Sequence, residues 1–468
     1  MIRQMTFNKY SRRKFLGTLP CMALGTTTLY SSLINLKAMN TIAASTSGLE
    51  GDYKALVCIL LSGGNDSFNM LVPRSSNEYA EYAATRSNQA LARESLLPIN
   101  VLDGDGREYG LHPSLTRLKG MFESGNLAFI SNVGSLVEPV NKESVLNGSA
   151  KLPLGLFSHS DQQMHWQTAF PQARSSSGWG GKMADILKDL NTSDEVSMNI
   201  SLGGNNIFQR GDSIIEYAIN NDGGVAIQGW NNPEPFLAMM TEDINDMVNR
   251  NYEDIFKDSY KGVLKRSIDS NEFFNTAIEN INPLATVFSD NNLSQNLRMV
   301  AQTISARESL GASRQIFFIN FGGFDNHDEL LNNHSALLEA LDIALSEFNS
   351  AMLELGVMNC VTTFTISDFA RTLTSNGNGT DHAWGGNALV MGGAVNGQKM
   401  YGDYPILSLG TSIELGGGVL MPTTSADEYF AELALWFGIS PNNLSSILPN
   451  IGNFYDSSST SAPLGFLI

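Results

Sequence analysis

Four short apolar runs, each closed by polar residues or glycine, are the clearest pattern along the chain. They cover residues 55–61, 127–133, 315–323 and 360–367. Continuous apolar runs of this length that contain β-branched residues are typical of strands buried on both faces of a parallel sheet. Between the last two runs, leucines at helical spacing predict a helix over about residues 333–355, ended by Gly356. Strand, long helix and strand form a βαβ unit, so the sequence predicts an α/β fold with a mostly parallel sheet flanked by helices.

Two further segments have helical spacing. Residues 231–310 are polar with apolar positions at helical intervals, and we predict that they form a helical insertion over or beside the sheet. Ser425 and Glu428 form a capping box that begins a helix running through Trp436, and Gly438 ends it. Since no internal repeat divides the chain, we predict a single domain over residues 45–468.

The first 44 residues have the pattern of an export signal. Arg12 and Arg13 precede a mildly apolar stretch, residues 17–34, which contains Pro20 and six serines or threonines. A pair of arginines before a short and only moderately hydrophobic segment is typical of a twin-arginine signal peptide, and the stretch is too polar for a permanent span. We therefore predict that residues 1–44 are removed and that the mature protein, without a membrane span, is periplasmic or secreted.

The net charge of the chain excludes some classes of binding partner. The chain has 29 Lys and Arg against 47 Asp and Glu, a net charge of −18. Removal of residues 1–44 takes away six basic and no acidic side chains, so the mature chain carries −24. Such a surface repels phosphate backbones and anionic lipids, and we expect neither nucleic-acid binding nor peripheral membrane binding. The sequence leaves the oligomeric state open.

The two cysteines of the mature chain lie inside apolar runs. Cys58 is in the first run and Cys360 begins the last. Both are interpreted as small core residues. A disulfide between them would require neighbouring strands, and nothing in the sequence requires one.

Candidate chemistry lies directly after the apolar runs, because ligands of open α/β sheets bind at the carboxyl ends of the strands. The residues found there, and in the glycine-rich loop that follows, are Asp66, Ser67, Asp325, His327, Asp368, Arg371, Asp381 and His382. Several carboxylates at one sheet edge repel one another unless a cation neutralises them. We therefore predict a site for a divalent metal held by Asp66, Asp325, His327, Asp368 and His382. An oxygen and nitrogen set of this kind suits Zn²⁺ or Mn²⁺ better than Ca²⁺.

The carboxylates also have simpler interpretations. Asp66 follows two glycines and an asparagine, and it could be a turn residue or a helix N-cap. Asp368 could cap the following helix or pair with Arg371.

The same holds for the other candidates. His327 and His382 could hydrogen-bond loop backbone, and Ser67 could be an ordinary residue of a first helical turn. His159 belongs to a second polar cluster, residues 158–166, that could line the pocket or form a capped loop. The sequence has no Gly-x-Ser-x-Gly elbow, phosphate-binding loop or His-Glu-x-x-His motif.

Motifs along nearly the whole mature chain resemble those of a bacterial family of twin-arginine-exported proteins, domain-of-unknown-function family 1501. They occupy residues 63–66, 158–159, 178–181, 323–327, 368–372, 381–385, 422–424 and 436–438. That family is similar in fold to the alkaline phosphatase and sulfatase superfamily. The resemblance implies an alkaline-phosphatase-like domain with one or two metal ions at the strand ends.

The resemblance also implies roles for individual residues. The superfamily's first-strand carboxylate matches Asp66, its later Asp and His match Asp325 and His327, its next carboxylate matches Asp368, and its final His matches His382. The chain departs from the superfamily at Phe369, where a second histidine is usual, so one ligand is missing.

These matches imply an exported metal-dependent hydrolase of phosphate or sulfate esters, acting on an anionic small-molecule or polymer ester. Ser67, the hydroxyl nearest to the position of the superfamily nucleophile, or a water activated by the metal would attack the ester. Arg371 or His159 would steady the anionic group. The alternative is a non-catalytic, hydrolase-like scaffold that binds a polymer or another exported protein.

Overall fold

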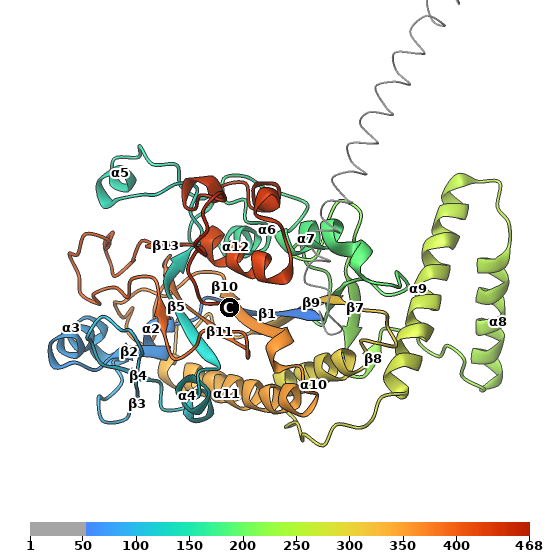
Figure 1. The fold of residues 1–468 in the computed structure, drawn as a ribbon, viewed down its shortest axis with the longest axis horizontal. Coiled ribbons are helices and arrows are strands. Elements are labelled where there is room, and N and C mark those ends of the chain that lie inside the picture. Colours follow the sequence, from blue (N-terminus) through green and yellow to red (C-terminus); the bar gives the residue numbers. More distant parts are fainter. Residues whose placement is uncertain (1–52) are drawn as a thin grey trace, which may run out of the picture. The chain divides into compact units, whose positions relative to one another are not determined.

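A ten-stranded sheet lies at the centre of the structure, a computed structural model that describes residues 53–468 (Figure 1). The predicted signal peptide lies outside the described residues. Along the sheet the strands are β12 (Met400–Tyr401), β5 (Leu127–Gly134), β11 (Gly386–Met391), β10 (Val361–Ser367), β1 (Lys54–Ser62), β9 (Arg314–Gly322), β6 (Asn199–Ser201), β7 (Tyr217–Asn220) and β8 (Gly223–Gly224), with β13 (Thr424–Ser425) beside β5. A smaller sheet contains β2 (Leu71–Pro73), β4 (Tyr109–Leu111) and β3 (Leu97–Ile99).

The predicted mostly parallel sheet is confirmed. Strands β10, β1, β9, β6 and β7 run parallel to one another, whereas β11 is antiparallel to both β10 and β5. Each of the four predicted apolar runs forms a strand, namely β1, β5, β9 and β10. Apolar residues that point to both faces of these strands are buried, because helices cover both faces of the sheet.

Alternate residues of β1 enter two separate cores. Val57 and Ile59 pack in the core that contains α4 (Thr116–Glu123), α10 (Asn292–Ser305) and α11 (Leu330–Glu354). Leu56 and Cys58 pack in the core that contains α7 (Trp179–Leu187), α12 (Ala426–Phe437) and α13 (Leu444–Ile447). Figure 1 shows the two helix layers on opposite sides of the sheet. Four shorter helices are α2 (Ser67–Met70), α3 (Ser76–Arg86), α5 (Lys142–Leu146) and α6 (His159–Thr168).

The two helices predicted individually are confirmed. Helix α11 begins three residues before its predicted start and ends just before Gly356. At the start of α12, Ser425 Oγ accepts a hydrogen bond from the Glu428 amide at 3.1 Å, and Glu428 Oε2 accepts one from the Ser425 amide at 3.1 Å. This reciprocal pair is the predicted capping box.

The segment from 231 to 310 is helical, as predicted, but its parts lie in different places. Helix α9 (Ile255–Glu279) packs against β8, and helix α8 (Pro235–Asn249) lies on the side of α9 that faces away from the sheet (Figure 1). Helix α10 is instead part of the core layer, where it packs against α11. Its apolar stripe is buried by that neighbour, so only the first two helices form a projecting insertion.

Two further features concern the cysteine pair and the possibility of a membrane-spanning helix. Cys58 lies opposite Phe364 of β10, and Cys360 precedes that strand, so the two thiols are not side by side and no disulfide joins them. Within residues 53–468, no helix combines the length and the apolar character that a membrane span requires.

Candidate metal centre

The register of the central strands brings three loops to one edge of the sheet. Leu61 of β1 pairs with Ser367 of β10, and Ser62 pairs with Gly322 of β9, so all three strands end at the same level. Directly after β1, Gly63 has a φ of +115°, and a Cβ there would overlap the backbone nitrogen of Asp325. Glycine at this position therefore allows the loop after β1 to contact the loop that carries Asp325 and His327.

A short antiparallel pairing places His382 at the same edge. Arg371 and His382 form an isolated β-bridge, and the amide of Ala383 donates to the carbonyl oxygen of Ala370 at 2.8 Å. The glycine-rich loop before His382 contacts the β9 loop, since Asn376 Nδ2 donates to the carbonyl oxygen of His327 at 3.2 Å. His382 and His327 are thereby held close together, with ring centroids 4.8 Å apart and ring planes inclined at 50°.

His159 reaches the site from helix α6, which belongs to the helix layer that contains α7 and α12. It is the first residue of α6, and Phe157, two residues earlier, has a φ of +72°. This left-handed conformation is strained for an aromatic residue and is found mostly where surrounding contacts enforce it. The carbonyl oxygen of Phe157 accepts a hydrogen bond from His382 Nδ1 at 2.7 Å, so one loop positions both histidines.

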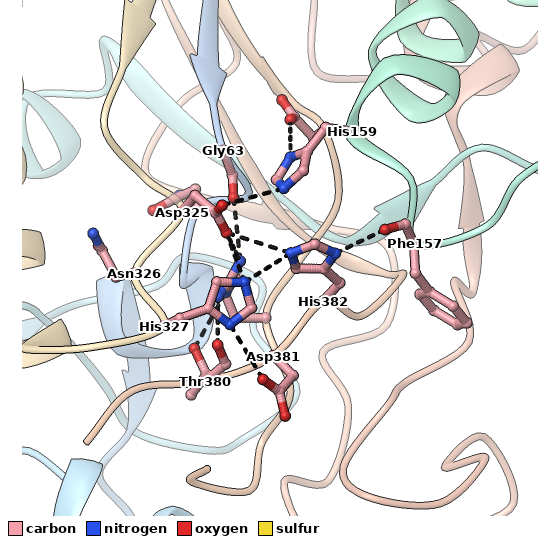
Figure 2. Close-up of polar contacts among 12 residues, drawn as sticks. Gly63, Phe157, His159, Asp325, Asn326, His327, Thr380, Asp381 and His382 are labelled. Atoms are coloured by element: carbon pink, nitrogen blue, oxygen red, sulfur yellow. Dashed lines mark hydrogen bonds and ion pairs between the residues drawn. The ribbon is translucent and has the colours of Figure 1, made fainter. Parts of the chain in front are cut away.

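Three imidazoles converge on the carboxylate of Asp325 (Figure 2). The Nε2 atom of His159 lies 3.3 Å from Asp325 Oδ2, and those of His327 and His382 lie 3.0 and 3.4 Å from Asp325 Oδ1. The Nε2 atoms of His327 and His382 are 2.9 Å apart. One ligand atom from each of His159, Asp325 and His382 falls within a group no more than 4.8 Å across.

The Nδ1 atom of each imidazole faces an acceptor. His159 Nδ1 lies 2.7 Å from Asp368 Oδ2, His382 Nδ1 has the Phe157 carbonyl oxygen, and His327 Nδ1 lies 3.2 Å from Asp381 Oδ1. Because each of these oxygens accepts a hydrogen bond, Nδ1 is the nitrogen that carries the proton in the neutral form of each ring. The lone pair of each Nε2 therefore points toward the centre, as in histidines that ligate metals.

The chemistry and spacing of these donors fit a divalent cation. Ligands 2.0–2.1 Å from a tetrahedral zinc are about 3.3–3.4 Å from one another. The three distances from Nε2 atoms to an Asp325 oxygen and the distance between the Nε2 atoms of His327 and His382 are 2.9–3.4 Å, close to that spacing, and the ligand atoms of His159, Asp325 and His382 lie within 4.8 Å of one another. Two Nε2 lone pairs 2.9 Å apart repel each other unless a proton or a cation lies between them. Three nitrogens and one oxygen are also the ligand types expected for Zn²⁺ or Mn²⁺.

The pKa shifts of Asp325 and His382 also favour metal binding. Partial burial raises the pKa of Asp325, but the hydrogen bond and the charge of Arg371 outweigh it, so the pKa lies below its ordinary value. Burial lowers the pKa of His382, against the opposing effect of the Phe157 carbonyl oxygen. An ionised carboxylate and a neutral imidazole are the forms that bind metal.

Arg371 is buried, and each of its three guanidinium nitrogens has a partner. Nη1 donates to Asp325 Oδ1 at 2.7 Å and to the carbonyl oxygen of Gly63 at 3.3 Å. Nε donates to Thr380 Oγ1 at 3.3 Å, and Nη2 donates to the carbonyl oxygen of Thr380. These contacts fix Asp325 and the histidine loop. Arg371 therefore positions Asp325 and the histidine loop, and contact of Arg371 or His159 with an anionic group stays a prediction.

Two of the predicted ligands have other partners. Asp368 is fully buried, and its Oδ2 accepts from His159 Nδ1 and from Gln163 Nε2 at 2.9 Å, so it lies behind a ligand. Asp66 is also buried and forms an ion pair with Arg86 of α3. That guanidinium supplies the neutralising charge that the sequence analysis expected from a metal.

Phe369 and Ser67 lie next to the centre. The Phe369 ring stacks on His382 with centroids 4.5 Å apart and lies 4.8 Å from the ring of His159. Ser67 is buried, and its Oγ accepts a hydrogen bond from the amide of Asn387 at 2.8 Å. Both residues line a cavity of about 20 Å³, which has room for about one water. The hydroxyl thus faces this small cavity and makes no hydrogen bond to the three histidines.

The structure brings the predicted Asp325, His327 and His382 together, whereas Asp66 lies against Arg86 and Asp368 against His159 and Gln163. His159 was predicted to line the pocket, to belong to a capped loop or to steady an anion, and it was not among the predicted ligands, although a histidine that begins a helix can project toward a strand edge. Asp381 was noticed in its loop without a role, yet it accepts from His327 Nδ1. The adjacency of Asp381 and His382 was the available signal for a ligand and the partner of another ligand.

Several solved structures are similar to this chain. The lipoteichoic acid synthase LtaP from Listeria monocytogenes has 8% identity and a TM-score of 0.32, covering 83% of this chain and 74% of that one. The sulfatase PsFucS1 from Pseudoalteromonas sp. has 8% identity and a TM-score of 0.34, covering 86% and 71%. The soluble domain of lipooligosaccharide phosphoethanolamine transferase A from Neisseria meningitidis has 10% identity and a TM-score of 0.29, covering 83% and 89%.

A comparison with curated proteins gave no match. A family model does match, over residues 53–445, and this range includes every residue of the candidate centre. The chain therefore belongs to the family described as protein of unknown function (DUF1501).

Proposed function

We propose that this protein is an exported, metal-dependent hydrolase of phosphate or sulfate esters, with one cation held by His159, Asp325, His327 and His382. One observation carries the proposal. Three imidazoles have their Nδ1 atoms fixed by acceptors and their Nε2 atoms directed at one carboxylate. A side-chain arrangement that leaves lone pairs facing one another is costly without a cation.

When bound, a divalent cation would supply Lewis-acid polarisation of an ester oxygen. Neutral histidines and a single carboxylate leave a dication with a net positive charge of about one. This local charge favours an anionic ester on a protein whose overall charge is strongly negative. Arg371 keeps Asp325 ionised and oriented while the substrate enters and leaves.

Solvent water is the proposed nucleophile. The side chains of the four ligands are 24–44% exposed, so water reaches them directly. Ser67 is buried and bonded to the amide of Asn387, which favours water over the serine hydroxyl.

A single cation is proposed because the remaining carboxylates already have cationic or N–H partners. Asp66 pairs with Arg86, and Asp368 accepts from His159 and Gln163. A second ion at either carboxylate would have to displace a buried hydrogen bond or face a buried guanidinium, and like charges repel strongly there.

Export to the periplasm or the cell exterior is proposed from the twin arginines. Replacing Arg12 and Arg13 together by lysine should leave the uncleaved protein in the cytoplasm, as fractionation and immunoblotting would show. Unchanged export of this double variant would contradict the proposal.

A metal-binding scaffold without catalysis is the second candidate. The contacts of Ser67 and Arg371 favour it, because neither side chain is free to act on a substrate. Such a protein would bind the metal and a polymer or protein partner, and it would be stabilised by the metal.

Metal analysis together with turnover of p-nitrophenyl phosphate and p-nitrophenyl sulfate tests both candidates. We expect about one equivalent of zinc or manganese in the mature protein and measurable hydrolysis. Both should be lost in Asp325→Asn and kept in Asp328→Asn, a matched change in the same loop whose carboxylate contacts Asn378 instead. Metal without turnover would support the scaffold, and protein that binds no metal even when zinc is supplied would refute the proposed centre.

A further inference from the structure

Helix α8 and the first four turns of α9 bury little against the rest of the protein. In α8 only Thr241 and Val248 are buried, and in α9 the first buried residue is Asn271. Figure 1 shows the two helices side by side, projecting from the sheet near β8. We call residues 235–270 the α8–α9 arm.

The arm carries large apolar side chains that face solvent. Phe256 is 83% exposed and Ile255 is 76% exposed, and four more residues of the arm are exposed: Phe236, Met239, Tyr260 and Val263. A groove of about 440 Å³ runs along it, lined by Met247, Tyr252, Phe256, Lys257, Tyr260 and Lys261. Exposed apolar clusters of this kind mark interaction surfaces on soluble proteins.

The apolar residues lie on stripes of both helices. In α8, Phe236, Met240 and Met247 share the spacing of one helix face, and in α9 Phe256, Tyr260 and Val263 do the same. Stripes of this width are normally buried by a neighbouring helix. The two helices cover each other only in part, which leaves one side of the pair without a partner among the described residues.

The charges beside these stripes are of opposite sign on the two helices. Helix α8 contains three acidic residues and no basic one, namely Glu242, Asp243 and Asp246. The α9 part of the arm, residues 255–270, contains four basic and two acidic residues: Lys257, Lys261, Lys265, Arg266, Asp258 and Asp269. The acidic helix has a charge of −3 and the α9 part +2, so one arm complements another.

We propose that two copies of this chain associate through their α8–α9 arms. A two-fold axis would set α8 of one copy against α9 of the other, twice, forming an antiparallel four-helix bundle. Such an interface is self-complementary in both its apolar stripes and its charges. An anionic membrane is a poorer partner, because the carboxylates of α8 flank the apolar surface and would be repelled.

Analytical ultracentrifugation of the mature protein at about 20 µM tests the arrangement. Wild-type protein should sediment as a dimer, and Phe256→Asp should sediment as a monomer that keeps its metal content and far-UV circular dichroism. A wild-type monomer would overturn the proposal, and so would a dimer that persists in Phe256→Asp. Binding of a monomer to vesicles of anionic phospholipid would overturn it in favour of a membrane surface.

Charge reversal tests the pairing of α8 with α9 more specifically. In one variant, Lys257→Glu and Lys261→Glu make both helices acidic. In the other, Asp243→Lys and Asp246→Lys change the charge of α8 from −3 to +1, so both helices are basic. Each variant alone should be mainly monomeric because its like charges meet at the interface. An equimolar mixture should restore dimers, since acidic α9 then faces basic side chains on α8. Failure of the mixture to dimerise, while both variants remain folded, would refute this pairing.

Discussion

Replacing Asp368 by asparagine tests how the centre is built, because it changes a partner of a ligand and no ligand itself. The fully buried carboxylate accepts from His159 Nδ1 at 2.7 Å and from Gln163 Nε2 at 2.9 Å. Asparagine keeps the size and an accepting oxygen but removes the negative charge. A hydrogen bond to an ionised acceptor is roughly twice as strong as a neutral one.

The expected loss follows from that difference. Removing such a partner typically weakens metal binding about 10–100-fold, which corresponds to about 1.4–2.8 kcal/mol. Because Asp368 has no exposure to water, we expect a value near the upper end. The metal-free variant should be about as stable as the metal-free wild type, since an amide is cheaper to bury than a carboxylate.

Competition for zinc with a chromophoric chelator measures this affinity directly. Asp161→Asn is the matched control, because Asp161 also belongs to α6 but pairs with Arg174 at 3.4 Å, outside the centre. Asp368→Asn should lose affinity while Asp161→Asn keeps it. If Asp368→Asn binds zinc as tightly as wild type and Asp325→Asn does not, the hydrogen bond to His159 does not set ligand strength and the reasoning fails.

Three further predictions concern other parts of the protein. Asp381→Asn should weaken zinc binding about tenfold in the same competition assay if His327 is a ligand, and an unchanged affinity would remove His327 from the centre. Gly63→Ala should cost at least about 2 kcal/mol in urea unfolding, because its Cβ meets backbone at a positive φ, whereas Gly120→Ala, with open space around it, should cost nothing. Burial raises the pKa of Asp427 to about 8, so folding takes up a proton between about pH 4 and pH 8. The contribution of Asp427 to the free energy of unfolding therefore falls as pH rises through this range, by up to about 1.4 kcal/mol per pH unit. Asp427→Asn should remove this slope, and parallel curves of stability against pH for the two proteins would contradict the prediction.

The central strands could be predicted because a strand that is buried on both faces is a run of mostly apolar residues in the sequence. β1, β9 and β10 are each a continuous apolar run, and the residues after them meet because the strands are parallel and end together. The approach of Asp325 and His327 to one edge follows from that rule alone. His382 could be included because its loop follows β10 closely in the chain.

The remaining site residues could not be predicted from such patterns. Arg86 reaches Asp66 from the last turn of α3, and no periodicity identifies which arginine will turn inward. His159 comes from a helix whose position depends on how α6 and α7 pack on the sheet, which is a tertiary outcome. The charge partners of a buried carboxylate are decided by packing, so the sequence could show that Asp66 needs a cation without showing which one.

The ligands of the centre come from three separated segments, and this has a consequence for folding. His159 and Asp368 are 209 positions apart, and Phe157 and His382 are 225 positions apart. Before these segments meet, an incomplete chain offers a metal only the neighbouring Asp325 and His327. A cation bound by all of them would join α6, the β9 loop and the histidine loop only once folding is complete. Zinc should then mainly lower the unfolding rate. It would lengthen the lifetime of the native state and leave the folding rate nearly unchanged.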